Sequence, residues 1–111
     1  QTGKILSPRI IMISTRNRVE ELIKNPENEL YLLDNHITRE ELWACTTCNA
    51  CVEACPLNID PLDIIIQMRQ YLVMEESSAP QSINAMNTNI ENNGAPWAYS
   101  QADRGIWIKE E

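Results

Sequence analysis

The chain has 111 residues, which is enough for one modest domain with a small hydrophobic core. Its formal net charge is −7, and this acidic balance argues against nucleic acid as a partner, because phosphate binding needs clustered Lys and Arg. No apolar run is long enough to span a bilayer, and no secretory signal is visible at the start. Only three glycines and no phenylalanine are present, so the composition favours helices over strands.

The first predicted helix begins at Ser7-Pro8, where an N-cap residue precedes a proline that fits the first turn. It ends at Asn25-Pro26, because the residue before a proline is disfavoured in the helical conformation. Its apolar residues recur mostly at helical spacing and are Ile10, Ile13, Val19, Leu22 and Ile23. A connector over residues 25–37 is predicted to bury the apolar side chains of residues 30–33.

Two further helix starts are visible in the middle of the chain. Thr38 and Glu41 form a capping box, which predicts a short helix that leads directly to the first cysteine. Asp60-Pro61 begins a longer helix, which is predicted to end near Glu76.

The last third of the chain follows a break at residues 77–80. Another helix is predicted to end at Asn93-Gly94, since glycine adopts the left-handed conformation at low cost, and Ser100 opens a final short helix that contains Trp107. We therefore predict an all-α fold of short helices. It comprises a helix and linker, a central core with all the cysteines, and a C-terminal helical extension, at residues 1–37, 38–76 and 77–111.

All the recognisable chemistry lies in one motif, Cys45-x2-Cys48-x2-Cys51-x3-Cys55-Pro56. Bacterial-type ferredoxins use this spacing to bind cubane 4Fe–4S clusters. The first three thiolates are close enough for the backbone to wrap one face of a compact cluster, and the proline directs the chain away after the fourth. The motif predicts that Cys45, Cys48, Cys51 and Cys55 are cluster ligands.

Three other interpretations of the four cysteines compete with this one. Disulfides suit small secreted proteins, but cysteines this close in sequence form strained bridges. Structural zinc sites usually pair two C-x2-C units that are separated by a dozen or more residues. A thioredoxin-like pair needs an adjacent βαβ pattern, which is not visible. The iron–sulfur interpretation is favoured, with zinc as the main alternative.

The sequence LWACTTCNACVEACP at residues 42–56 resembles the second cluster motif of α-helical dicluster ferredoxins, as does the segment at residues 68–73. This family includes the heterodisulfide reductase small subunit, the glycolate oxidase iron–sulfur subunit and the C-terminal half of succinate dehydrogenase iron–sulfur subunits. Residues 89–97, with Arg104 and Trp107, are similar to the segment after the ferredoxin module in heterodisulfide-reductase-related proteins. Residues 2–9 resemble the linker after the first cluster motif.

The resemblance implies an α-helical ferredoxin-like fold around the cluster motif. It also implies that Cys45, Cys48 and Cys51 hold one 4Fe–4S cluster together with an upstream cysteine, while Cys55 serves a second cluster. The first cysteine motif of the family would then lie upstream of Gln1, and the chain is expected to be a segment of a larger protein. If the chain is complete as given, all four cysteines must share one cluster.

The expected function is the relay of single electrons inside a larger oxidoreductase complex. The resemblance implies a flavoprotein or another cluster as donor, and a quinone, a disulfide or a downstream redox module as acceptor. The alternatives are a zinc-binding interaction module and part of a catalytic disulfide- or quinone-reducing subunit. We expect a cytoplasmic location, with any attachment to the inner face of the membrane made through the parent protein or its partners.

A few other side chains carry weaker expectations. Trp43 is predicted to shield the cluster from water, and His36, the only histidine, to be a surface or capping group. The side chains of Met68, Met74 and Met86 are predicted to pack in the core.

The acidic residues near the motif, Glu53, Asp60 and Asp63, disfavour the addition of an electron to a cluster that is already anionic. We therefore predict a low midpoint potential for the bound cluster. An anaerobic redox titration measures it directly, and a clearly positive midpoint would contradict the prediction.

Overall fold

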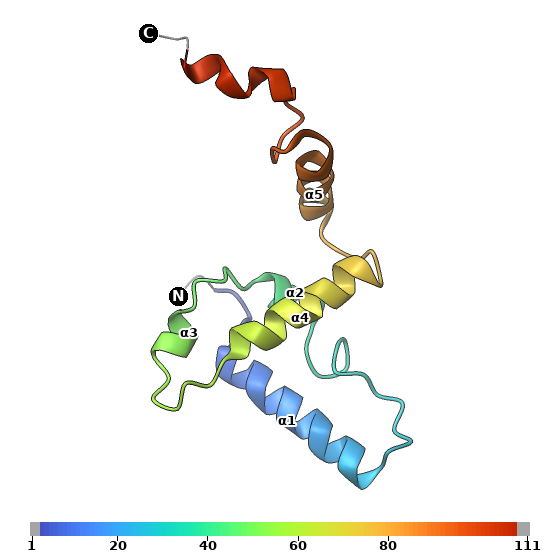
Figure 1. The fold of residues 1–111 in the computed structure, drawn as a ribbon. Coiled ribbons are helices and arrows are strands. Elements are labelled where there is room, and N and C mark those ends of the chain that lie inside the picture. Colours follow the sequence, from blue (N-terminus) through green and yellow to red (C-terminus); the bar gives the residue numbers. More distant parts are fainter. Residues whose placement is uncertain (1–2, 109–111) are drawn as a thin grey trace. The chain divides into compact units, whose positions relative to one another are not determined.

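The computed structural model describes residues 3–108, which form an all-α fold, as predicted. The helices are α1 (Pro8–Lys24), α2 (Arg39–Trp43), α3 (Ala50–Glu53), α4 (Pro61–Met74) and α5 (Gln81–Asn93), followed by a 3₁₀ helix, η1 (Gln101–Ile108) (Figure 1). Leu33 and Ile37 make an isolated β-bridge, and residues 3–108 contain no strand. No helix in this range is long and apolar enough to cross a membrane.

The contacts divide the chain into two compact units, one ending at Glu75 and the other beginning at Glu76. The first unit contains α1 to α4, and the second contains α5 and η1. The three-part organisation inferred from the sequence remains a prediction.

The predicted helix starts of the first unit are confirmed. Pro8 occupies the first turn of α1, and Thr38 caps α2 through a complete capping box, in which its hydroxyl accepts from the amide of Glu41 at 3.2 Å. The carboxylate of Asp60 accepts from the amide of Asp63 at 3.0 Å and caps α4. These local bonds satisfy amides that have no partner within the helix, which is why the starts were readable from sequence.

The second unit also follows its local signals. Gly94 ends α5 in the left-handed conformation, at a φ of 67°, and its amide donates to the carbonyl of Ile90 at 2.8 Å. The Ser100 hydroxyl accepts from the amide of Ala102 at 3.2 Å at the start of the final helix. That helix is of the 3₁₀ type, which the sequence did not predict.

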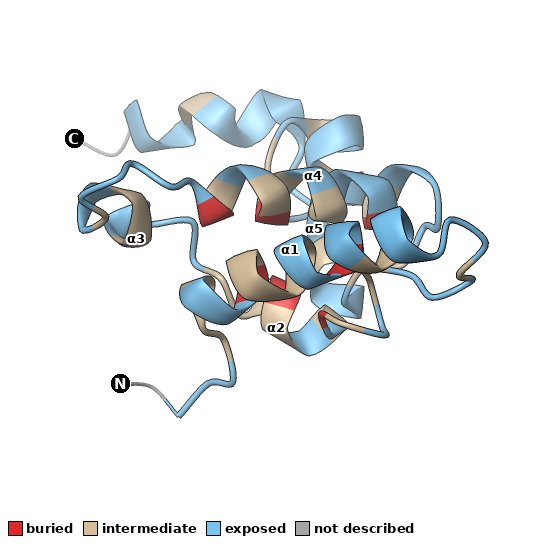
Figure 2. Ribbon diagram, turned by 90° about the horizontal axis from the view of Figure 1, so that it is seen from below, coloured by how far each residue is buried: buried red, intermediate tan, exposed pale blue. Residues whose placement is uncertain are grey.

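The hydrophobic core belongs to the first unit and contains five almost fully buried side chains, Ile11, Ile37, Leu42, Ile65 and Leu72. They come from α1, the connector, α2 and α4, and the buried positions of these helices face one another (Figure 2). Seven half-buried residues pack against this core, and the first cysteine of the motif, Cys45, is one of them.

The helix predicted from the apolar spacing is present as α1, but its buried positions are not the apolar residues that predicted it. The helix buries Ile11 and the polar Arg18, while Ile23 is 75% exposed. Arg18 can be buried because the connector folds back along the helix: its guanidinium donates to the carbonyl of Asn28 at 3.1 Å and to the carboxylate of Glu21 at 3.4 Å. Sequence spacing alone cannot reveal such partners.

The methionines divide between the core and the surface. Met68 packs against the core, as predicted. Met74, the last residue of α4, is 76% exposed, and Met86 of α5 is also exposed. The prediction that all three pack in the core is therefore wrong for two of them.

The connector and the histidine bring further corrections. Leu32 and Leu33 pack against the core as predicted, but Leu30 and Tyr31 are exposed. His36 is no surface group: its side chain is 17% exposed, with Nε2 3.0 Å from the carboxylate of Glu21.

Leu72 and Met74 offer a matched pair for testing the core. We expect Leu72→Ala to lower the free energy of unfolding by about 2 to 5 kcal/mol, because it leaves a cavity among buried side chains. Met74→Ala, on the same helix but exposed, should change it by less than about 0.5 kcal/mol. Urea unfolding followed by circular dichroism measures both, and equal effects would contradict the position of the core.

Candidate iron–sulfur site

The cysteine motif occupies the connection between α2 and α4, as predicted. Cys45 and Cys48 lie in the loop after α2, Cys51 lies within α3, and Cys55 follows α3. The four-residue helix α3 was not predicted from the sequence, although its N-cap residue, Asn49, is of a type favoured at that position.

All four cysteines are free thiols. Cys45, Cys51 and Cys55 are half-buried, and Cys48 is exposed. Half-burial suits a ligand that must bind a cofactor at the protein surface while limiting its contact with water.

The loop around Cys48 has an unusual backbone. Thr47 and Asn49 both have positive φ angles, 57° and 62°, and this region is strained for a β-branched residue such as threonine. The turn directs amides toward sulfur: the amide of Thr47 donates to the thiol of Cys45 at 3.4 Å. Concave runs of backbone amides of this kind recur at anion and iron–sulfur sites.

The same backbone acts on the second cysteine. A hydrogen bond from the amide of Ala50 holds the pKa of the Cys48 thiol below its ordinary value, and the side chain of Thr46 contributes in the same direction. Because the thiolate is the form that binds metal, this environment favours ligation.

The cysteines line two adjoining cavities of the first unit. The larger, of about 460 Å³, is lined by Cys45, Cys48 and Cys51, and the smaller, of about 330 Å³, is lined by Cys51 and Cys55. Cys51 and Pro8 contribute to both cavities. The structure therefore divides the four predicted residues between the cavities: Cys45 and Cys48 line only the larger one, Cys55 lines only the smaller one, and Cys51 lines both.

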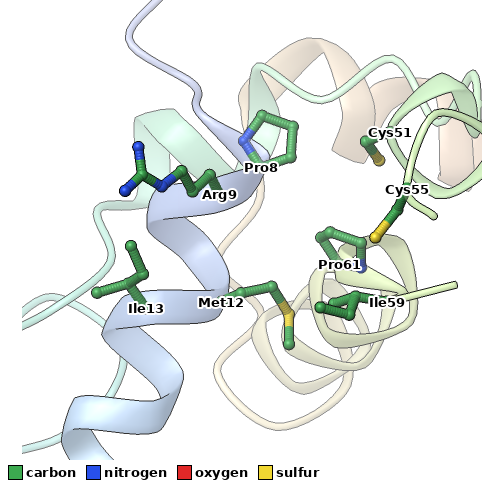
Figure 3. A pocket seen from close by; sticks show the side chains of 8 residues that line it. All are labelled: Pro8, Arg9, Met12, Ile13, Cys51, Cys55, Ile59 and Pro61. Carbon is green, nitrogen blue, oxygen red and sulfur yellow. The ribbon is translucent and has the colours of Figure 1, made fainter. Parts of the chain in front are cut away.

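The walls of the smaller cavity are mostly apolar. Figure 3 shows the sulfur atoms of Cys51 and Cys55 on one side of it, with Pro61 near Cys55, while the guanidinium of Arg9 points away from the cysteines. The larger cavity also includes one basic residue, Lys4. The sequence did not identify Lys4, Arg9 and Met12 as wall residues, because they lie far before the motif along the chain.

The donor set fits an iron–sulfur cluster. A cubane places its thiolate ligands at different irons, so they surround a cage and do not meet at one point. The four thiols line the two cavities in this way, with the thiol of Cys51 shared between them.

For Trp43, the shielding of the cluster from water stays a prediction. The Trp43 side chain packs against the core and lines neither cavity, and its ring faces the guanidinium of Arg69.

Comparison with known proteins adds independent evidence. Residues 10–59 match the family model of the 4Fe–4S dicluster domain. This segment includes all four cysteines, α2, α3 and most of α1. No solved structure matches the chain significantly.

Curated relatives are redox proteins by name. The probable iron–sulfur-binding oxidoreductase FadF of Bacillus subtilis is 39% identical over 71% of this chain and 11% of its own length. The EtfAB:quinone oxidoreductase of Syntrophomonas wolfei is 31% identical over 98% of the chain and 19% of its own length. One subunit of the ferredoxin/F(420)H(2)-dependent CoB-CoM heterodisulfide reductase of Methanosarcina acetivorans is 34% identical over 72% of the chain. That match covers 45% of the relative, so the chain spans less than half of each of these three proteins.

The cysteines should differ in reactivity when no cluster is bound. We expect limiting iodoacetamide at neutral pH to alkylate Cys48 several-fold faster than Cys45 or Cys51, because Cys48 is exposed and its pKa is lowered. Mass spectrometry of peptide fragments locates the label, and the urea-denatured chain, in which the four thiols should react alike, is the control. Preferential labelling of Cys45 would show that the loop is not arranged as described.

Proposed function

Because this chain belongs to the 4Fe–4S dicluster domain family, we propose that it relays single electrons within a larger oxidoreductase. The observation that carries the proposal is the gathering of four free cysteines around two adjoining cavities. A bound 4Fe–4S cluster takes up and releases one electron with little rearrangement.

In this proposal the cysteines serve two clusters. Cys45, Cys48 and Cys51 hold one cluster in the larger cavity, with a fourth thiolate supplied from upstream in the protein. Cys55 contributes to a second cluster in the smaller cavity, together with further upstream cysteines. The separation of Cys55 from Cys45 and Cys48 supports this division over a single cluster shared by all four.

The protein's own part is to hold the thiols and to control their surroundings. The strained turn at Thr47 and Asn49 presents amides to the sulfurs, and the apolar walls limit access of water. Thiolate ligation of every iron leaves no coordination position for a substrate, so electron transfer is the chemistry that this site suits.

The partners are other redox subunits or domains. We infer a flavoprotein as the electron donor and a quinone or a disulfide as the acceptor. The names of relatives, which mention EtfAB, quinone and heterodisulfide, agree with this inference. Because quinones dissolve in the bilayer, a quinone acceptor would place the working complex at a membrane, held there by the parent protein or its partners. We propose that it works at the inner, cytoplasmic face.

The division of the ligands can be tested on an anaerobic preparation that includes the residues upstream of Gln1. We expect about eight irons per molecule and two overlapping EPR signals after reduction. Cys48→Ser should remove one signal and Cys55→Ser the other, with loss of about half of the iron in each variant.

Loss of the same signal in both variants would show that one cluster uses all four cysteines and would contradict the division. A preparation that contains zinc and no iron or sulfide would overturn the electron-transfer function as a whole and favour a zinc-binding module.

A further inference from the structure

Arg69 connects α4 to the start of the cysteine loop. It lies in the second half of α4, yet its guanidinium donates to the carbonyl of Leu42 at 2.7 and 3.1 Å and to the carbonyl of Cys45 at 2.6 Å. Both acceptors lie at the end of α2 or just beyond it, 27 and 24 residues away along the chain.

These carbonyls need a partner from outside their own helix. The last carbonyls of an α-helix have no intrahelical donor, and a five-residue helix such as α2 has little stability of its own. The planar guanidinium can donate to two acceptors at fixed angles, which an ammonium group cannot reproduce. Arg69 therefore fixes the direction in which the chain leaves Leu42 and reaches Cys45.

The aromatic ring of Trp43 completes this arrangement. Its centroid lies 4.9 Å from the central carbon of the Arg69 guanidinium, at a distance that suits a cation–π interaction. The guanidinium is thus held by two carbonyls and one ring, and it forms no ion pair with a carboxylate in the part of the chain that the structure describes. Its positive charge is fixed in place beside the backbone of the first predicted ligand.

The acidic groups near the motif do not fully offset the positive charge of Arg69. Glu53, Asp60 and Asp63 are exposed, so water and salt screen them, whereas Arg69 is half-buried. A fixed, partly desolvated cation near a redox centre stabilises the form that carries the additional electron.

We propose that Arg69 is a positioning residue for electron transfer, which holds Cys45 in place for the cluster and raises the midpoint potential of that cluster through its charge. The inference rests on the proposed function, namely that a cluster binds to Cys45, Cys48 and Cys51. The low potential expected from the acidic residues would be lower still without Arg69.

Two substitutions separate the charge from the hydrogen bonds. Arg69→Gln removes the charge and keeps a donor, while Arg69→Lys keeps the charge and loses the two-acceptor geometry. Arg16→Met is the matched control, since Arg16 is 68% exposed and its bonds go to Asn17 and Glu20 on α1, whereas those of Arg69 go to the start of the cysteine loop. All forms, including the wild type, are prepared anaerobically with the upstream residues and assayed for iron, sulfide and midpoint potential by EPR-monitored titration.

We expect Arg69→Gln to reduce the ratio of reduced to oxidised cluster at a fixed potential by about tenfold, which corresponds to a shift of about 59 mV for one electron. Only the signal that Cys48→Ser removes should shift. Arg69→Lys should keep the midpoint close to that of the wild type, and Arg16→Met should leave it unchanged. An unshifted midpoint in a fully loaded Arg69→Gln variant would overturn the proposal.

If Arg69→Gln binds no cluster, the result for Arg69→Lys tests whether the charge has the proposed role. Recovery of the cluster content in Arg69→Lys, with a midpoint near that of the wild type, supports the role of the charge. Failure of both variants to bind a cluster would overturn the role of the charge and show that the arginine is purely structural. Absence of iron and sulfide from the wild type would instead refute the proposed function, so the two failures are distinguishable.

Discussion

The packing of Cys45 against the hydrophobic core is the contact on which the site depends. This cysteine is half-buried against a core of only five fully buried side chains, one of which, Leu42, lies three residues earlier on α2. Because α2 is too short to be stable alone, the burial of Leu42 holds it in place. The position of the first predicted ligand is therefore a consequence of tertiary packing, and the remaining cysteines follow from it along the loop.

Beyond Cys45 the loop is shaped by backbone conformation and only to a small extent by side-chain packing. Thr47 and Asn49 adopt positive φ angles on either side of the exposed Cys48, and the short helix α3 then carries Cys51 to the boundary between the two cavities. A strained threonine in such a loop has a structural cost of about 1 to 3 kcal/mol, and strain of this size is typically found where function requires it. Here it directs amides toward the sulfurs.

Two sets of charges have opposite effects on the proposed cluster site. The whole chain carries a net charge of −7, and water and salt screen its charges wherever they are exposed. Close to the start of the motif, however, Arg69 contributes a positive charge that is held by carbonyl groups and by the ring of Trp43. The exposed acidic groups interact with the cluster site through water, while the half-buried arginine interacts with it through protein. The strength of each electrostatic interaction therefore depends on how close and how buried the charge is.

The sequence by itself determined the features that depend on neighbouring residues: the all-α class, the helix starts at Pro8, Thr38 and Asp60, and the thiol spacing that predicts a 4Fe–4S cluster. Caps and ligand motifs are readable because both partners lie within a few residues of each other. Only the tertiary structure decided which side chains are buried, such as Arg18, and how the cysteines divide between two cavities. It alone brought Arg69 to the carbonyl of Cys45, because contacts across 24 residues depend on how α4 packs on α2, which no local pattern encodes.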